Sequence, residues 1–370
     1  YGGDSMSDKL LHYGMVGGAL DSMIGETHRN AILLDGRAEL VCGCFSRDLE
    51  KTLKTGKKWG IKEGRLYKDY LEMAEEESRR GDRIDFVVIA TPNSSHYEIA
   101  KAFLERGINV VCDKPLTTTL REAEDLKEIA DKNNLLLCVT YSYAGYPVIS
   151  RARDIVRSGK IGEVRFVNVQ YVQGWLARDI EKENKQAAWR LDPSQSGLAN
   201  TTADIGSHVE NMVSVLVEKE IDTLCARLDT FGKSRQLEDT STVMINFKDG
   251  AKGLLHMSQI AVGENNNFTV SIYGTTATLK WAFAEPNKLR ILHEDYTEEI
   301  VQKEIVTPGT NIGFKNIYSA FISDLIAKRN GEQITNDNAH FQSVNAGLRG
   351  MRFIEKCVES AKNGSTWVKF

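Results

Sequence analysis

The run 84-IDFVVIATPNSSHYEIAKAFLERGINVVCDKP-115 decides the fold class of the first half of the chain. It begins and ends with short β-branched segments, 84–90 and 108–113, that are typical of buried strands. Between them, 96–107 carries apolar residues at helical spacing and ends at a glycine. A strand, a helix and a second strand in this order predict a βαβ unit, whose two strands lie parallel in one sheet.

The same alternation extends on both sides of this unit. Three more strands are predicted at 10–16, 38–45 and 135–141, and one more long helix is predicted at 119–134. Alternating strands and helices build a parallel sheet covered by helices on both faces. Residues 7–145 are therefore predicted to form a doubly wound α/β domain.

The pattern changes after residue 145. A helix at 147–159 is followed by segments with strand character, which lie at 163–174, 239–247, 251–261, 268–274, 276–283 and 288–294. Short turns such as 248-KDG-250 join several of them, and such turns favour antiparallel hairpins. Two long helices are predicted at 314–330 and 338–364. We expect residues 146–370 to form an α+β domain for substrate binding and oligomerisation, with a large, mostly antiparallel, open-faced sheet and a C-terminal helix that can pack back on the first domain.

Composition narrows the class of partner. The chain has 370 residues, of which 41% are hydrophobic, and a formal net charge of −4. No basic cluster is present to neutralise phosphates, and no apolar run approaches the ~20 residues that span a bilayer. Six scattered cysteines form no zinc pattern. We expect a cytoplasmic protein with a small-molecule partner, no nucleic acid, no membrane and no metal.

Ligands of doubly wound sheets bind beyond the carboxyl ends of the strands. After the first strand, Gly17 and Gly18 can let the backbone approach a pyrophosphate, although a tight turn alone would also use them. In 14-GMVGGALDSMIG-25 the ordinary G-x-G-x-x-G is lengthened, and the helix is expected to begin at about Gly25. These features predict a dinucleotide-binding Rossmann domain.

The ends of the next strands supply further candidate cofactor contacts. After the second strand, Ser46 and Arg47 can hold a 2′-phosphate, yet Ser46 or Asp48 can equally cap the next helix, so NAD and NADP stay open. The remaining predicted cofactor-side residues are Thr91, Pro92, Asn93 and His96 after the third strand, and Asp113 and Lys114 after the fourth.

Two motifs carry a family resemblance. The segment 113-DKP-115, preceded by 91-TPNSSH-96, resembles the Gfo/Idh/MocA oxidoreductases, and 204-DIGSHVEN-211 strengthens the likeness. The resemblance implies a nicotinamide cofactor and a catalytic set of Lys114, Asp204 and His208 that takes part in proton transfer. Asp204 and His208 are four apart and share one face if a helix begins there, although Asp204 can also cap that helix and His208 can pack in an interface.

Polar and aromatic residues suggest a carbohydrate site. The segment 174–197 is rich in tryptophan and basic residues, and aromatic faces pack on sugar C–H groups while charged groups bond hydroxyls. A surface loop anchored by its tryptophans, or a subunit contact, is the alternative reading. The predicted substrate-binding residues are Tyr143, Tyr146, Trp175, Lys185, Trp189, Arg190 and Asn211.

The resemblance implies hydride transfer between a nicotinamide and a secondary hydroxyl of a sugar, a glycoside (at C3, for instance) or a cyclitol. One alternative is an enzyme that retains its nicotinamide and oxidises a glycoside transiently to permit elimination or deglycosylation. Another is a non-catalytic nucleotide sensor. Because an open-faced sheet is costly to expose, a homo-oligomer is expected.

Overall fold

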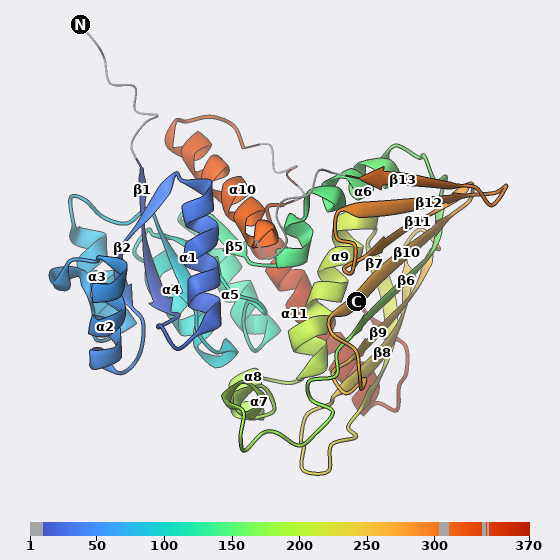
Figure 1. The fold of residues 1–370 in the computed structure, drawn as a ribbon, viewed down its shortest axis with the longest axis horizontal. Coiled ribbons are helices and arrows are strands. Elements are labelled where there is room, and N and C mark those ends of the chain that lie inside the picture. The colour runs from blue at the N-terminus through green and yellow to red at the C-terminus, as the bar shows by residue number, and fades with distance from the viewer. Residues whose placement is uncertain (1–9, 303–310, 335–337, 339) are drawn as a thin grey trace, which may run out of the picture. The chain divides into compact units, whose positions relative to one another are not determined.

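A computed structural model describes residues 10–302, 311–334, 338 and 340–370. The described chain divides into two compact units (Figure 1). The first comprises the described residues of Tyr1–Thr117, Arg121–Gly145 and Gly309–Gly347. The second comprises those of Thr118–Leu120, Tyr146–Pro308 and Leu348–Phe370.

The first unit is built on a five-stranded sheet in the order β2-β1-β3-β4-β5. All its strand pairs are parallel, as the βαβ reading predicted. The strands are β1 (Leu11–Gly17), β2 (Ala38–Cys44), β3 (Phe86–Ala90), β4 (Asn109–Cys112) and β5 (Leu137–Val139). The helices are α1 (Met23–Asp35), α2 (Leu49–Trp59), α3 (Tyr70–Arg79), α4 (His96–Leu104), α5 (Leu120–Lys132) and α10 (Ile312–Arg329).

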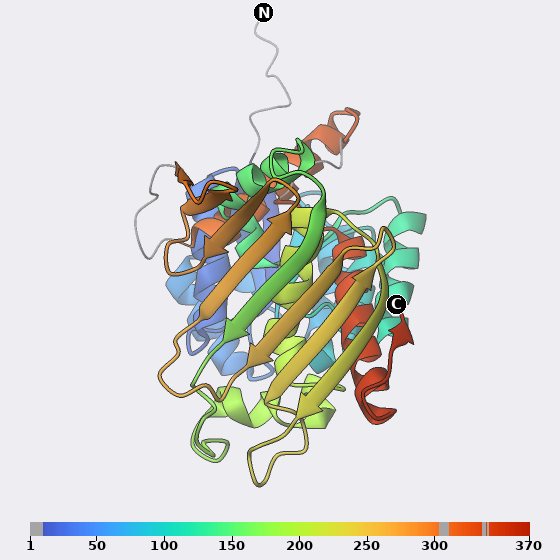
Figure 2. The same cartoon turned by 90° about the vertical axis from the view of Figure 1, so that its right-hand side faces the viewer.

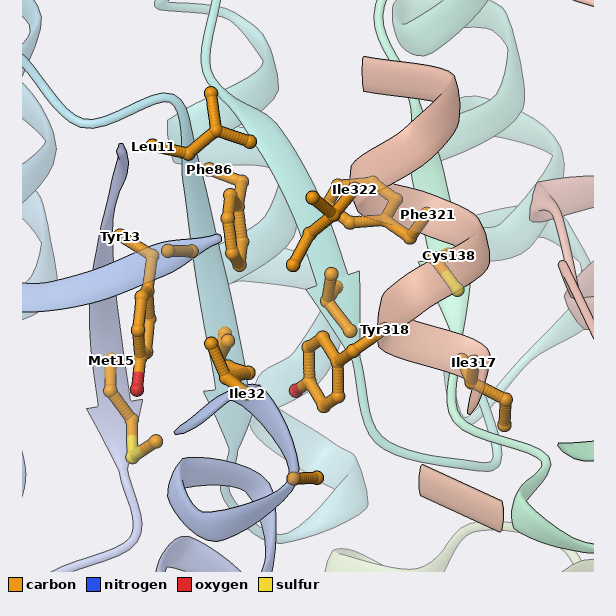
Figure 3. Packing of buried hydrophobic residues seen from close by; sticks show 14 of the residues in the cluster. Leu11, Tyr13, Met15, Ile32, Phe86, Cys138, Ile317, Tyr318, Phe321 and Ile322 are labelled. Carbon is orange, nitrogen blue, oxygen red and sulfur yellow. The ribbon is translucent and has the colours of Figure 1, made fainter. Parts of the chain in front are cut away.

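Aromatic side chains fill the core on one face of this sheet (Figure 3). Tyr13 of β1 stacks on Phe86 of β3, with ring centroids 5.3 Å apart. Phe321 of α10 meets Phe86 edge to face at 5.2 Å. Complete burial of each such ring stabilises the fold by roughly 1.5–3 kcal/mol, so this cluster ties α10 firmly to the sheet.

The described residues of Gly309–Gly347 thus belong to the first unit, although the sequence predicted that they belong to the second domain. The reason is tertiary packing, since Ile317, Tyr318 and Ile322 join Phe321 in the core beside β1 and β3. The following residues also pair with the sheet edge: the amide of Val139 donates to the carbonyl of Gln342 at 2.8 Å. This extended pairing explains why the last long helix, α11 (Val344–Lys362), begins at Val344 rather than at the predicted residue 338.

The second unit is built on a nine-stranded sheet in the order β13-β12-β11-β10-β6-β9-β8-β7-β14. Its neighbours pair antiparallel except β6 and β9, which are parallel. The strands are β6 (Val164–Val172), β7 (Ile221–Asp229), β8 (Thr240–Phe247), β9 (Lys252–Ser258), β10 (Asn267–Gly274), β11 (Ala277–Ala282), β12 (Lys288–His293), β13 (Glu298–Gln302) and β14 (Val368–Lys369). Three of these strands, β7, β13 and β14, were not predicted from the sequence.

Helices cover one face of this sheet and leave the other open (Figure 2). A β-carbon on Gly206 would lie 3.3 Å from Met257 of β9 and 3.7 Å from Phe353 of α11, so the chain at Gly206 is packed between the sheet and α11. On the open face, Phe166 of β6 and Tyr273 of β10 are each 37% exposed, and Met244 of β8 is 45% exposed. The remaining helices of this unit are α6 (Pro147–Arg157), α7 (Lys185–Arg190), α8 (Pro193–Ser196) and α9 (Ser207–Val217).

None of the helices in the described part of the chain is both long enough and apolar enough to cross a bilayer.

Candidate functional site

The loop after β1 is shaped by three glycines. Gly17 and Gly18 have φ values of 80° and 71°, which residues with a β-carbon rarely adopt. A β-carbon on Gly17 would lie 2.3 Å from the carbonyl oxygen of Ala90. Gly25, inside α1, would place a β-carbon 2.0 Å from the carbonyl oxygen of Gly18. Gly25 is therefore needed for the close approach of helix and loop, and α1 begins at Met23, two residues before the predicted start.

This loop fits the pyrophosphate of a dinucleotide. Ser22, the residue before the helix, makes no side-chain capping bond to the first turn of α1, so that its hydroxyl does not occupy the first-turn amides. Amides at a helix N-terminus together with its dipole favour a negative charge. The residues present therefore suit the group that the glycine pattern implies.

In the loop after β2, the Ser46 side chain bonds the backbone, whereas the Arg47 side chain is exposed. The Ser46 hydroxyl accepts a hydrogen bond from the amide of Asp48 at 3.1 Å, and the Asp48 side chain caps α2 by accepting from the amide of Glu50. Arg47 is exposed to solvent. Asp48 is therefore the residue that caps the helix, as the alternative predicted. Arg47 is the positively charged residue that follows β2.

His96 joins the loops that follow β3 and β4. Its ring is fully buried, with Nε2 2.9 Å from the carbonyl oxygen of Thr91 and Nδ1 2.9 Å from the carbonyl oxygen of Pro115. Both ring nitrogens are therefore engaged by backbone, and His96 is not the exposed first-turn residue that was the alternative. Beside it, Pro92 is exposed and Asn93 is buried.

Lys114 stands in a tightly specified turn. The Lys114–Pro115 peptide bond is cis. One carboxylate oxygen of Asp113 accepts both the amide of Lys114, at 3.0 Å, and the hydroxyl of Thr140 beyond β5, at 2.8 Å. Asp113 thus fixes the backbone at Lys114, whose own side chain is half-buried.

The segment 204-DIGSHVEN-211 begins with a change of helix type. Residues Thr202–Gly206 form a π-helical turn, which passes directly into α9 at Ser207. π-helical turns inside α-helices occur frequently at functional sites. Asp204 lies in the π turn and is partly exposed, whereas His208 and Asn211 lie in the first part of α9 and are buried.

A buried carboxylate holds the start of this turn. Glu238 accepts hydrogen bonds from the amides of Asn200, at 3.0 Å, and Thr202, at 2.7 Å. Burial raises the pKa of Glu238, although these two amides oppose the change. Glu238 was not found from the sequence, because no local motif marks a carboxylate that caps a helix 36 residues upstream.

Asp204 lies between an amide and a guanidinium group. Its Oδ2 accepts a hydrogen bond from Nε2 of Gln259 at 2.8 Å, and its Oδ1 lies 3.4 Å from Nε of Arg190. The Arg190 guanidinium also stacks over Trp189, 4.3 Å from the ring centroid, and lies 5.9 Å from that of Trp175. The structure therefore brings together four of the predicted residues: Asp204, Arg190, Trp189 and Trp175.

A second basic residue anchors the segment that carries Trp175. The Arg235 side chain, 1% exposed, pairs with Glu181 at 2.7 Å and with the buried Asp239 at 3.2 Å. Arg235 was missed from the sequence, because its partner Glu181 lies 54 residues away and the spacing to Asp239, four residues on, is common to many surface pairs.

Three further predicted substrate residues are Lys185, Tyr146 and Tyr143. Lys185 is exposed at the first position of α7. Tyr146 meets Phe283 edge to face at 5.9 Å, and burial raises the pKa of Tyr146. Tyr143, in the turn after β5, is half-buried.

The predicted residues belong to both units. The glycine loop, Ser46, Arg47, the loop with Thr91, Lys114 and Tyr143 belong to the first, whereas Tyr146, Asp204, His208, Asn211 and the 174–197 segment belong to the second. Among the described residues, no group of three or more histidine, cysteine, aspartate or glutamate side chains is arranged to hold a metal ion.

Comparison with known proteins identifies both units. Residues 11–141 match the model of the oxidoreductase family with an NAD-binding Rossmann fold, and residues 149–280 match the GFO/IDH/MocA C-terminal domain. The uncharacterized oxidoreductase YfiI of Bacillus subtilis is 33% identical over 100% of this chain and 99% of its own length. Levoglucosan dehydrogenase of Pseudarthrobacter phenanthrenivorans is 29% identical over 56% of this chain and 58% of its own.

Solved structures agree over nearly the whole chain. An inositol dehydrogenase homolog from Azotobacter vinelandii, complexed with NAD⁺, superposes with a TM-score of 0.92 and 33% identity, covering 98% of each chain. The same homolog complexed with NADH and myo-inositol gives a TM-score of 0.89 and 32% identity, again covering 98% of each chain. The chain belongs to the Gfo/Idh/MocA family of NAD-binding oxidoreductases.

Proposed function

We propose that this protein is an NAD(P)-dependent dehydrogenase that oxidises a secondary hydroxyl of a sugar, a glycoside or a cyclitol. The observation that carries the proposal is that one chain holds Lys114 in a turn fixed by Asp113 after β4, and carries Asp204 in the π turn that leads into α9 and His208 in the first turn of α9. A lysine, an aspartate and a histidine supply the charge and the proton acceptor that alcohol oxidation requires.

In this proposal the nicotinamide, when bound, takes up the hydride from the substrate carbon. The Lys114 ammonium orients the reacting hydroxyl. His208 accepts the hydroxyl proton during oxidation and returns it during reduction. Asp204 orients the other groups as a fixed acceptor. Proton transfer by a well-placed side chain contributes ~10²–10⁴-fold to the rate.

The cofactor is assigned to the carboxyl ends of the first unit's strands. Gly17 and Gly18 contact the pyrophosphate, Ser46 and Arg47 flank the adenosine ribose, and the backbone around Thr91, Pro92 and Asn93 faces the nicotinamide half. His96 does not contact the cofactor in this proposal. It holds the loops after β3 and β4 in place through the carbonyl groups of Thr91 and Pro115. An exposed Arg47 with no acidic residue directly at the end of β2 suits NADP as well as NAD.

The substrate is assigned to the polar and aromatic residues of the second unit, together with Tyr143. Trp175 and Trp189 offer ring faces to C–H groups, and Lys185, Arg190 and Asn211 offer donors to hydroxyls. The Azotobacter vinelandii homolog was solved with myo-inositol, which supports a polyol or sugar here. Oxidation at C3 of a glycoside is one candidate reaction.

We also propose that the chain is a homo-oligomer whose copies meet on the open face of the nine-stranded sheet. Phe166 and Tyr273 lie on the paired strands β6 and β10 of that face, Met244 lies on β8 beyond β9, and all three are partly exposed. A sheet face with half-exposed aromatic residues is a feature of surfaces that pair.

The decisive experiment identifies the cofactor released from the purified protein and then screens polyols for its reduction. We expect growth of the reduced nicotinamide absorbance with at least one of myo-inositol, levoglucosan or a glucoside. If substrate is consumed without net reduction, the cycle with a retained nicotinamide would replace this proposal. If nucleotide binds and no sugar or cyclitol reacts, the nucleotide-sensor alternative would replace it.

A further inference from the structure

Gln259, which directly follows β9, lies at the centre of a closed hydrogen-bond network in the second unit. Its side chain is fully buried. Oε1 accepts hydrogen bonds from Nδ2 of Asn200, at 3.0 Å, and from the hydroxyl of Thr201, at 3.1 Å. Nε2 donates to Oδ2 of Asp204, at 2.8 Å, and to Oε1 of Gln173, at 3.2 Å. All four hydrogen-bonding positions of the amide are therefore filled.

The orientation of this amide is fixed from both ends. Nδ2 of Asn200 also donates to the backbone carbonyl of Glu238, at 3.2 Å, so Asn200 presents a donor to Gln259. Oε1 of Gln173 also accepts the indole N–H of Trp175, at 3.1 Å, so Gln173 presents an acceptor. A backbone carbonyl and an indole N–H cannot exchange roles, so turning the Gln259 amide over would place donor against donor and acceptor against acceptor.

The fixed orientation of the Gln259 amide determines the hydrogen-bonding role of the Asp204 carboxylate. An amide N–H₂ group is a donor only, so Oδ2 of Asp204 must accept. The other oxygen, Oδ1, faces the permanently charged Arg190. A donated hydrogen bond and a neighbouring cation both favour the ionised form of a carboxylate.

We propose that Gln259 is a positioning residue that holds Asp204 as an ionised acceptor and couples it, through Gln173, to Trp175 in the substrate segment. The inference rests on the proposed function, since Asp204 matters through the proton transfer assigned to it. In this arrangement Asp204 does not hand a proton to the substrate; that task stays with His208. Gln259 touches neither hydroxyl nor nicotinamide and acts through Asp204.

The test replaces Gln259 by glutamate, which keeps the size of the side chain and exchanges the donor for an oxygen. Two carboxylates at hydrogen-bond distance cannot both ionise, so the pair retains one proton to a higher pH. We expect the acidic limb of the kcat/KM profile to move up by about one pH unit or more in Gln259→Glu. Gln259→Met, which removes all four hydrogen bonds of the amide, should lower kcat without moving that limb.

The matched control is Gln333→Glu. Gln333 is exposed after α10 in the first unit, and it receives the same change of charge. Its pH profile should overlay that of the wild type. If Gln259→Glu also overlays the wild type, or falls uniformly at every pH, the positioning role is overturned.

A second readout does not depend on the substrate. The shared proton gives the introduced glutamate a folded-state pKa above its unfolded value, so its contribution to stability is lost as the pH rises. We expect the melting temperature of Gln259→Glu to fall relative to wild type between about pH 5 and pH 8. A deficit independent of pH would overturn the inference even if no polyol were oxidised, whereas an inactive wild type would overturn only the proposed function.

Discussion

Gly25 approaches Gly18 so closely that a β-carbon on Gly25 would lie within 2.0 Å of the Gly18 carbonyl oxygen. The obstructing atoms are backbone and cannot rotate away. The third glycine of the lengthened loop therefore lets helix α1 lie against the turn that is proposed to hold the pyrophosphate.

Gly25→Ala should weaken both folding and nucleotide binding. Alanine is favoured over glycine inside a helix by ~1 kcal/mol, so helix propensity alone would stabilise the variant. Any loss in the free energy of unfolding must therefore come from the displaced loop, because overpacking costs about 1–3 kcal/mol. Urea unfolding and titration with NADH measure the two effects. Gly64→Ala, which meets no atom within 4 Å, is the matched control, and equal behaviour of the two variants would contradict the prediction.

Lys114→Met and His208→Asn should each lower kcat by ~10²–10⁴-fold while leaving the dissociation constant of NADH nearly unchanged. The reason is that both groups are assigned to the reacting hydroxyl. Steady-state kinetics and fluorescence titration separate the two quantities. Lys132→Met, at the exposed end of α5, makes the same change away from the site. Turnover above a tenth of the wild-type value in both site variants would refute their roles.

His28 should make the first unit sensitive to acid. It is fully buried in α1, with Nδ1 2.7 Å from the hydroxyl of Tyr318 in α10, and burial lowers its pKa below 6.5, against a weaker opposing effect of Asp113. A histidine with a depressed folded-state pKa binds its proton more readily when unfolded. Stability is therefore complete above about pH 6.5 and is lost as the pH falls below it, by at most ~1.4 kcal/mol per pH unit.

The comparison variant for this prediction is His28→Asn, which does not titrate and can still accept from Tyr318. Its free energy of unfolding should lie below that of the wild type at pH 7.5, and the gap should narrow toward pH 5. Denaturant unfolding across this range measures the gap. A gap that stays constant would show that His28 titrates alike in both states.

Phe166→Glu and Met244→Glu should reduce the oligomer to smaller species. Both residues lie on the open sheet face, where a buried carboxylate would have to lose its water. Sedimentation velocity measures the change in mass. Val262→Glu, at an 86% exposed position after β9, is the control. An unchanged assembly in both sheet variants would place the contact elsewhere.

The sequence predicted the parallel sheet well, because each of its strands is a short and largely buried run between helices or turns. It missed β7 and β13 for a physical reason. β7 carries Asp222, Arg227 and Asp229, and β13 begins with two glutamates, so neither shows the apolar alternation of a half-buried strand. Their strand character comes from the neighbours with which they pair.

Some residues of the candidate site could likewise be predicted from the sequence and others could not. Motif residues such as Lys114 and His208 could be proposed because their local context is distinctive. Gln259 and Arg235 could not, since the contacts that give them meaning, with Asn200 and Glu181 respectively, reach far along the chain. A single glutamine after a strand has no pattern that separates it from any surface glutamine.

The position of α10 has a consequence for synthesis. The core around Tyr13 and Phe86 is completed by Tyr318 and Phe321, which leave the ribosome long after residue 145. At about 5–20 residues per second, the roughly 185 residues from 145 to 330 take on the order of ten to forty seconds to make. During that interval the nascent nucleotide-binding unit exposes the aromatic face that α10 will cover, so the growing chain is a natural client for chaperones that bind apolar surface.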